Sequence, residues 1–272
     1  MIPITKIFED YTSTLMDESE TIALIKPLDE KELKQVTTLY SKVSIREDNL
    51  LMCLDKNDPR SFENIGGIFN PHSEAELLNI ISNRPNEIIL AMYTEEHKLF
   101  TTLYMSSKLK KWSEGEALHD WQYPCDDLGT KIFVKELEQA LEDERVVHLS
   151  ECVVSGVPGR GTTYALLYKC LKKMWEQGYE FAVLEVYCIM KYTYRGEEYP
   201  IQMNNERSRK LVTRAGAKWI GELPSHIDKK GEYDLHIKPN IYGMKLKDCL
   251  PVIKEILEKD YGQIQTLRRE IS

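Results

Sequence analysis

The sequence predicts an α/β fold of the α+β kind, with helices flanking a mixed central sheet and a helix at the C-terminus. Residues 146–190 read as strand, glycine-rich loop, helix and strand, a β-loop-α-β unit of the kind that joins parallel strands. Residues 87–105 hold two apolar, β-prone runs separated by a polar turn, which is typical of an antiparallel hairpin. The two patterns together indicate a mixed sheet.

The first third of the chain predicts a strand and two capped helices after a polar leader. Residues 21–25 favour a strand. Asp29 followed by Glu32, and Ser73 followed by Glu76, are capping-box pairs, in which the side chains satisfy the free backbone donors of a helix start. The stretch 46–71 between these helices carries Asp-Pro, Gly-Gly and Asn-Pro steps, so we expect irregular structure there.

The remaining elements follow from apolar spacing and turn residues. We expect strands at 146–154, 181–190, 218–223 and 233–237, and helices at 131–144, 164–177, 204–215 and about 248–269. Two polar or aromatic stretches, 106–144 and 191–203, look like insertions. Because no internal repeat or linker is visible, we expect one domain at 21–240, an N-terminal extension at 1–20 and a C-terminal helical extension at 241–272.

Charge and composition exclude several classes of protein. The 36 lysines and arginines are outnumbered by 44 acidic residues, so no overall positive field favours nucleic acid. No apolar run approaches the roughly 20 residues that span a bilayer, and the leader is interrupted by acids, unlike an export signal. The six cysteines form no CxxC pair and the six histidines show no metal-ligand spacing. We expect a cytoplasmic, soluble protein without a metal.

The glycine-rich loop between the strand at 146–154 and the following helix is the strongest functional signal. Gly156, Gly159 and Gly161 allow the main chain to approach a ligand, and the free N–H groups of a helix start favour phosphate. An ordinary tight turn is the alternative. A degenerate nucleotide-binding P-loop is another, since residues 156–163 read G-x-x-x-x-G-T-T, but Thr162 replaces the lysine that such loops require.

Segments in and beyond the loop resemble the GNAT superfamily of N-acetyltransferases in one shared order. Val153, Gly159, Gly161 and Leu166-Leu167 resemble its pattern V-x-P-x-x-R-G-x-G-x-G/A-x-x-L-L, with Pro158 and Thr163 as departures. A register shifted by two residues places Arg160 first and Ala165 at the final small position. Leu184-Glu185-Val186, Asn205 to Ser208 and Arg214 to Ala217 resemble later GNAT segments. The resemblance covers about residues 21–240 and implies acetyl-CoA as the acyl donor.

The resemblance also implies which residues bind acetyl-CoA. The fourth strand of the family separates from the fifth, and its main chain pairs with the pantetheine arm; the loop and helix start hold the pyrophosphate. These positions are Cys152, Val153 and Val154 on the strand, Gly159, Arg160, Gly161, Thr162, Thr163 and Tyr164 at the loop and helix start, and Asn205 and Ser208 at the last helix. Asn205 has a second interpretation, as the N-cap of that helix.

Acetyl transfer to an amine needs a general base, because an alkyl ammonium must lose a proton before it attacks. Glu151 is the preferred candidate and His148 the other. Their odd separation places them on opposite faces of a strand unless a bulge intervenes. The family's usual acid, a tyrosine in the last helix, is replaced by Val212. Tyr187, Tyr192 and Tyr194 are possible substitutes. Cys152 lacks a clear histidine partner, so we expect direct transfer.

The acceptor is expected to be an amine of a small molecule or a peptide, bounded by the two insertions. Aromatic residues there could line a cation-binding pocket, and Glu197 and Glu198 could attract an ammonium; lid packing and solvated charge are the alternatives. The aromatic candidates are Trp112, Trp121, Tyr123, Tyr192 and Tyr194. The C-terminal helix could pack across a homodimer. A non-catalytic acyl-CoA sensor or interaction module is the competing functional hypothesis, motivated by Val212 and Thr163.

Overall fold

The computed structural model describes residues 2–17, 20–43, 72–94, 97–107, 127–154, 161–199, 203–230 and 233–261. Its strands are β1 (Ser13–Asp17), β2 (Glu20–Pro27), β3 (Glu87–Tyr93), β4 (Leu99–Ser106), β5 (Val146–Val154), β6 (Phe181–Tyr194), β7 (Glu197–Tyr199), β8 (Met203–Asn204), β9 (Lys218–Glu222), β10 (His226–Lys230) and β11 (Tyr233–Lys245). The helices are α1 (Ile4–Ile7), the 3₁₀ helix η1 (Glu30–Glu32), α2 (Leu33–Val43), α4 (Glu74–Asn83), α6 (Leu128–Glu142), α7 (Thr162–Glu176), α8 (Glu206–Arg214) and α9 (Leu246–Tyr261).

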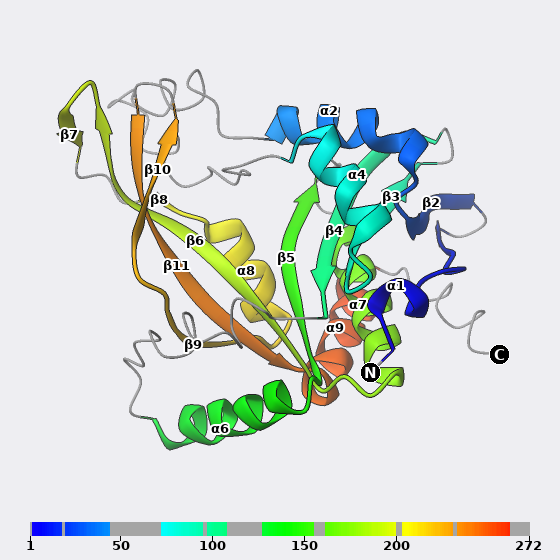
Figure 1. Cartoon of the computed structure of the whole chain (residues 1–272). Helices are drawn as coiled ribbons and strands as arrows, with labels where there is room; N and C mark the ends of the chain where they lie inside the picture. Colours follow the sequence, from blue (N-terminus) through cyan, green and yellow to red (C-terminus); the bar gives the residue numbers. More distant parts are fainter. Residues whose placement is uncertain are drawn as a thin grey trace.

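All the described strands belong to one mixed sheet with the order β1-β2-β3-β4-β5-β6-β11-β10 (Figure 1). The short strands β7 and β8 pair with β6, and β9 pairs with β11. Among the pairings that the structure describes, only β5 with β6 is parallel. The predicted fold class, a mixed sheet flanked by helices and followed by a C-terminal helix, is confirmed.

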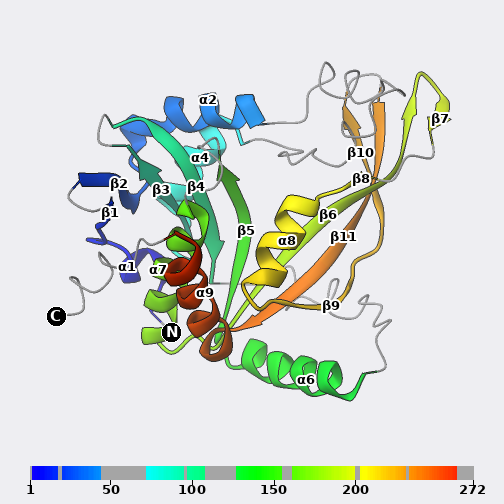
Figure 2. The ribbon, with the colours of Figure 1, turned by 180° about the vertical axis from the view of Figure 1, so that it is seen from behind.

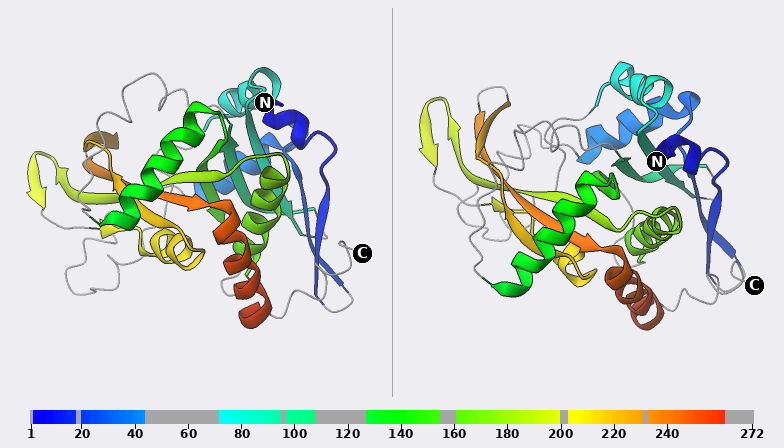
Figure 3. Two further views of the ribbon diagram at one scale, coloured as in Figure 1. Left: turned by 90° about the horizontal axis from the view of Figure 1, so that it is seen from below. Right: turned by 60° about the horizontal axis from the view of Figure 1, so that its bottom comes forward.

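Helices cover both faces of the sheet and divide its core into separate clusters. On one face α2 and α4 pack over β3 and β4, while α6 packs over the lower ends of β5, β6 and β11. On the other face lie α7, α8 and α9 (Figures 2 and 3). Helix α7 runs between the sheet and α9, and its residues from Tyr164 to Leu171 are therefore buried without interruption. No helix among the described residues is long and apolar enough to cross a membrane.

Several strands extend beyond their predicted ends, and four strands, β1, β7, β8 and β10, were not predicted. β6 continues to Tyr194 and turns into β7, so part of the stretch 191–203, expected to be an insertion, is sheet. β11 pairs with β6 along its whole length to Lys245, and β10 pairs with β11. In the leader, β1 pairs with β2. These segments lack a clear apolar alternation. They are strands because hydrogen bonds to a neighbouring strand hold them in that conformation. The proposed domain boundaries stay a prediction.

Both predicted capping boxes are present. Asp29 accepts from the backbone N–H of Lys31 while Glu32 accepts from that of Asp29, although this turn is 3₁₀ before α2 begins. At α4 the Ser73 hydroxyl oxygen accepts from the Glu76 N–H at 3.3 Å, and the Glu76 carboxylate accepts from the Ser73 N–H at 2.8 Å. The Ser73 N–H and then its hydroxyl hold the pKa of Glu76 below its ordinary value.

Replacing Ser73 by alanine is expected to lower the free energy of unfolding by about 1 kcal/mol at neutral pH, since one helix donor loses its partner. Glu76 has a lowered pKa when folded, so its contribution is present above its unfolded pKa and is lost as pH falls through the folded value. The difference between variant and wild type should therefore shrink in acid. Urea unfolding across this pH range measures it, with Ser82→Ala on the same helix, which removes only an exposed 3.2 Å hydrogen bond to Glu30, as the control. An effect of the same size in both variants would contradict the capping role.

Candidate active site

The sheet opens where its two parallel strands separate. β5 and β6 pair only through Val146, Val147 and His148 and then diverge, with β6 running on toward β7 (Figure 1). From Leu149 to Val154 the edge of β5 that faces β6 has no strand partner among the described residues, while its other edge stays paired with β4. The separation predicted between these strands is therefore present. An edge of this kind offers unpaired main-chain groups to an extended ligand.

A β-bulge on β5 lies at the base of this opening. Leu149 pairs with Met105 and Glu151 pairs with Tyr104, so Ser150 is the extra residue. The bulge changes the alternation of the strand. Ser106 and Tyr104 are two residues apart on β4, and they pair with positions 148 and 151 of β5. Both of the predicted general-base positions therefore fall in register with the same face of the sheet, which the sequence allowed only if a bulge intervened.

Three polar side chains meet at this point. His148 Nε2 lies 2.7 Å from the Glu185 carboxylate of β6, and His148 Nδ1 lies 3.0 Å from the Ser150 hydroxyl. The side chains of His148 and Glu185 are only 16% and 10% exposed. His148 was a candidate from the sequence, whereas Ser150 and Glu185 were not. Ser150 carried no pattern, and Glu185 was noticed only as part of the resemblance.

The predicted main-chain contacts for the acyl donor lie along the open edge of β5. Cys152, Val153 and Val154 pair with Leu103, Thr102 and Thr101 of β4. The predicted loop residues Gly159 and Arg160 lie outside the described residues. The strand thus leads from the three-residue array toward the start of α7.

Helix α7 starts without a side-chain cap. Gly161 is its N-cap, is buried and has a left-handed backbone (φ +66°), a conformation that glycine adopts without strain. The first bond of the helix runs from the Ala165 N–H to the Gly161 carbonyl. The N–H groups of Thr162 and Thr163 lie ahead of this bond, in the first turn, where no helix carbonyl precedes them. Such a helix start favours a phosphate group.

Helix α8 places a cation near the start of α7, and its own first turn shows what Asn205 and Ser208 do. The Arg214 guanidinium lies 6.0 Å from the ring centroid of Tyr164, in the first turn of α7, and adds positive charge there. Asn205 is the N-cap of α8, and its side chain accepts from the Ser208 N–H at 3.2 Å. The capping interpretation of Asn205 is therefore confirmed. Val212 is 4% exposed and packs in the hydrophobic core that includes α7 and α9.

The predicted acceptor residues are only partly described. Trp112, Trp121 and Tyr123 lie outside the described residues. Tyr194 ends β6, and its ring is covered by the Arg195 guanidinium at 5.0 Å. The exposed Glu198 accepts from Lys191 at 2.6 Å, and this hydrogen bond lowers its pKa. Glu198 is therefore an ionised partner of a lysine on the neighbouring strand rather than an isolated attractor of ammonium.

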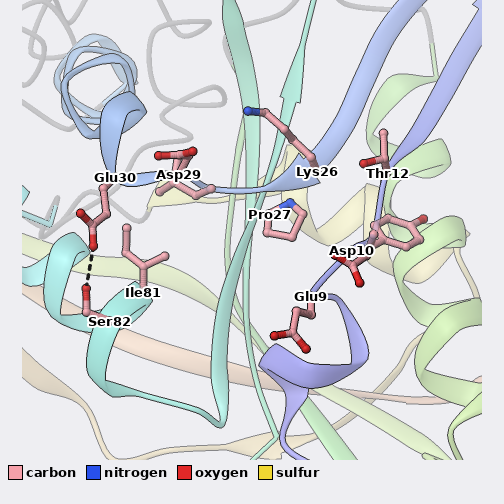
Figure 4. Close-up of a pocket in the computed structure, with 11 residues that line it drawn as sticks. Glu9, Asp10, Thr12, Lys26, Pro27, Asp29, Glu30, Ile81 and Ser82 are labelled. Carbon is pink, nitrogen blue, oxygen red and sulfur yellow. Dashed lines mark hydrogen bonds between the residues drawn. The ribbon is translucent and has the colours of Figure 1, made fainter.

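An open pocket of about 660 Å³ lies far from this opening, between α1, β2 and α4 (Figure 4). Glu9, Asp10, Asp29 and Glu30 give it an acidic lining. Its one lysine, Lys26, is bound to Glu32 at 2.6 Å. No group of three or more potential metal ligands occurs among the described residues. The opening between β5 and β6, where polar side chains and an open strand edge lie together, is therefore the candidate site.

Several solved structures of N-acetyltransferases are similar to this one at low sequence identity. An N-acetyltransferase from Staphylococcus aureus Mu50 has a TM-score of 0.46 at 15% identity, over 82% of this chain and 98% of that one. A GNAT phosphinothricin acetyltransferase from Sinorhizobium meliloti, in complex with AcCoA, has a TM-score of 0.44 at 14% identity, over 82% and 88%. No protein-family model and no curated protein sequence matches this chain.

Proposed function

We propose that this protein is an N-acetyltransferase that binds acetyl-CoA in the opening between β5 and β6 and transfers the acetyl group directly to an amine. The observation that carries the proposal is the open edge of β5 at Leu149–Val154, which leads toward the uncapped start of α7. The edge suits an extended pantetheine arm, whose amides need main-chain partners. The helix start and Arg214 suit the pyrophosphate.

The chemistry that follows is positioning plus stabilisation of developing charge. A thioester held along β5 would lie near the bulge at Ser150, where main-chain donors can polarise its carbonyl oxygen. Holding the amine against this carbonyl makes attack effectively unimolecular. We propose a small-molecule or peptide amine as the acceptor, with selectivity set by the segments that border the opening.

The test combines binding with turnover. Acetyl-CoA should raise the melting temperature, by an amount that grows with the logarithm of its concentration above Kd. A panel of amines, monitored by release of the CoA thiol and by mass spectrometry of products, should then identify an acetylated acceptor. Propionyl-CoA and longer acyl-CoAs define the donor. Failure of every acyl-CoA to bind would refute the proposal.

A non-catalytic acyl-CoA sensor is the second candidate. Val212 favours it, because this buried side chain stands where the resemblance implies a tyrosine acid. A catalytic protein of this kind would let the CoA thiolate take its proton from solvent. Binding of acetyl-CoA without turnover of any amine would support the sensor, whereas steady release of CoA would exclude it.

A further inference from the structure

The side chains of Ser150, His148 and Glu185 form a continuous hydrogen-bonded array at the base of the opening. Glu185 comes from β6, while His148 and Ser150 come from β5, and His148 is the last β5 residue that pairs with β6. The array therefore bridges the two strands at the point where they separate. The His148 and Glu185 side chains are largely withdrawn from solvent, whereas Ser150 is half-buried.

The order of the array determines where its protons lie. An ionised carboxylate can only accept, so His148 Nε2 must carry the hydrogen that lies toward Glu185. In the neutral ring Nδ1 is then the acceptor, and the Ser150 hydroxyl donates to it. The Ser150 oxygen keeps lone pairs for a donor from outside. This order matches the logic of a carboxylate that orients a histidine base next to a hydroxyl.

We propose that Ser150, His148 and Glu185 are a proton relay that deprotonates the acceptor ammonium, which rests on the function proposed above. The ammonium gives one proton to Ser150 Oγ as the Ser150 hydroxyl proton passes to His148 Nδ1. The nitrogen lone pair then forms the C–N bond to the thioester carbonyl carbon, and the C–S bond breaks. The second nitrogen proton passes through water to the CoA thiolate, and the imidazolium returns its proton to solvent.

Ser150 and His148 are the catalytic residues of this relay, and Glu185 is a positioning residue that acts through His148. The relay also explains the bulge. A structural ion pair between His148 and Glu185 would need no hydroxyl, yet the inserted residue supplies one to the remaining ring nitrogen. Bulges re-aim side chains next to active sites.

Other titratable groups face the same side of the sheet and must be separated from the relay. Tyr104 of β4 donates to Glu87 of β3, which also accepts from Arg84 at 2.9 Å. Burial, followed by the bond to Glu87, raises the pKa of Tyr104, so it stays protonated where a histidine titrates. Glu87 lies in register with Ser106 and through it with His148, two strand spacings or about 10 Å away. Glu151, in register with Tyr104, is the competing base.

The test uses the full-length protein with the best amine from the panel. We expect His148→Gln to lower kcat about 100-fold to 1000-fold, within the range for loss of a general base, while Kd for acetyl-CoA stays within about twofold. The acid limb of the pH profile of kcat/KM should disappear with it. Glu185→Gln should lower kcat roughly 10-fold to 100-fold, and Ser150→Ala about 10-fold, because water can replace the hydroxyl. His226→Gln, an exposed histidine on β10, is the matched control.

Rescue by imidazole distinguishes a base from a purely structural role of His148. His148→Ala leaves space for a ring, and added imidazole should restore activity at least tenfold if the histidine acts as a base. Retained kcat and pH profile in His148→Gln, with loss in Glu151→Gln instead, would overturn the relay while leaving the acetyltransferase in place. Wild-type protein with one acetyl group bound covalently to Ser150 would also overturn it. Absence of acyl-CoA binding or of any turnover by the wild type would refute the proposed function and the relay together.

Discussion

Replacing Gly161 by glutamate is expected to weaken acetyl-CoA binding about 100-fold. The residue caps α7 in a buried position, directly before the first-turn N–H groups of Thr162 and Thr163. A carboxylate about 5 Å from a phosphate charge costs about 3 kcal/mol at an effective dielectric constant near 20. That free energy corresponds to roughly two orders of magnitude in Kd. Isothermal titration with acetyl-CoA measures the change.

Two controls separate charge from backbone strain in this experiment. Gly161 has φ +66°, so any side chain there costs about 1–2 kcal/mol of stability. Gly161→Gln carries this strain without the charge and should bind acetyl-CoA much better than Gly161→Glu. Gly178→Glu places the same charge at the far end of α7, where φ is also positive, and should leave binding unchanged. Equal weakening by glutamate and glutamine would show that phosphate repulsion is not involved.

Replacing Phe181 by alanine is expected to lower the free energy of unfolding by about 3–5 kcal/mol. Phe181 starts β6, pairs with Val146 of β5 and is 1% exposed. Its ring meets that of Phe133 on α6 edge to face, with centroids 5.4 Å apart. The substitution leaves a cavity where α6 contacts the paired ends of β5 and β6. Guanidinium chloride unfolding of both proteins measures the loss.

The matched control for this cavity lies on the same helix. Leu128 starts α6 and is 71% exposed, so Leu128→Ala should change stability by no more than about 0.5 kcal/mol. A loss below about 1 kcal/mol in Phe181→Ala would mean that α6 settles into the cavity. Such a result would show that the contact between Phe181 and Phe133 is not needed to stabilise the paired ends of β5 and β6.

Local sequence patterns were sufficient for the elements whose own residues define them. The capping pairs Asp29 with Glu32 and Ser73 with Glu76 marked two helix starts, and both are present. The predicted strand at 146–154 coincides with β5. These predictions were correct because caps, turns and apolar spacing act over a few residues. A helix directly after the glycine-rich loop could be predicted for the same reason.

Pairing and layering depend on residues far apart in the chain, and local patterns did not reveal them. No strand was predicted at the position of β10, and β6 was expected to end at Met190, yet the ladder to β11 holds both as strands. Helix α7 was predicted at 164–177 from its apolar spacing, which marks one buried face. It buries almost its whole first half because α9, more than 70 residues later in the chain, covers it. A helix covered on two sides cannot be recognised from its own spacing.

The sequence by itself determined the fold class and the order of the main elements. It also indicated that a glycine-rich loop leads into α7. It also gave Glu151 and His148 as candidates for a general base, but it did not decide which face of the sheet each of them occupies. The tertiary structure decided the rest. The bulge at Ser150 depends on pairing with β4, and the contact of His148 with Glu185 depends on β5 and β6 lying side by side before they separate. Register and strand separation are properties of neighbouring strands, so no single segment encodes them.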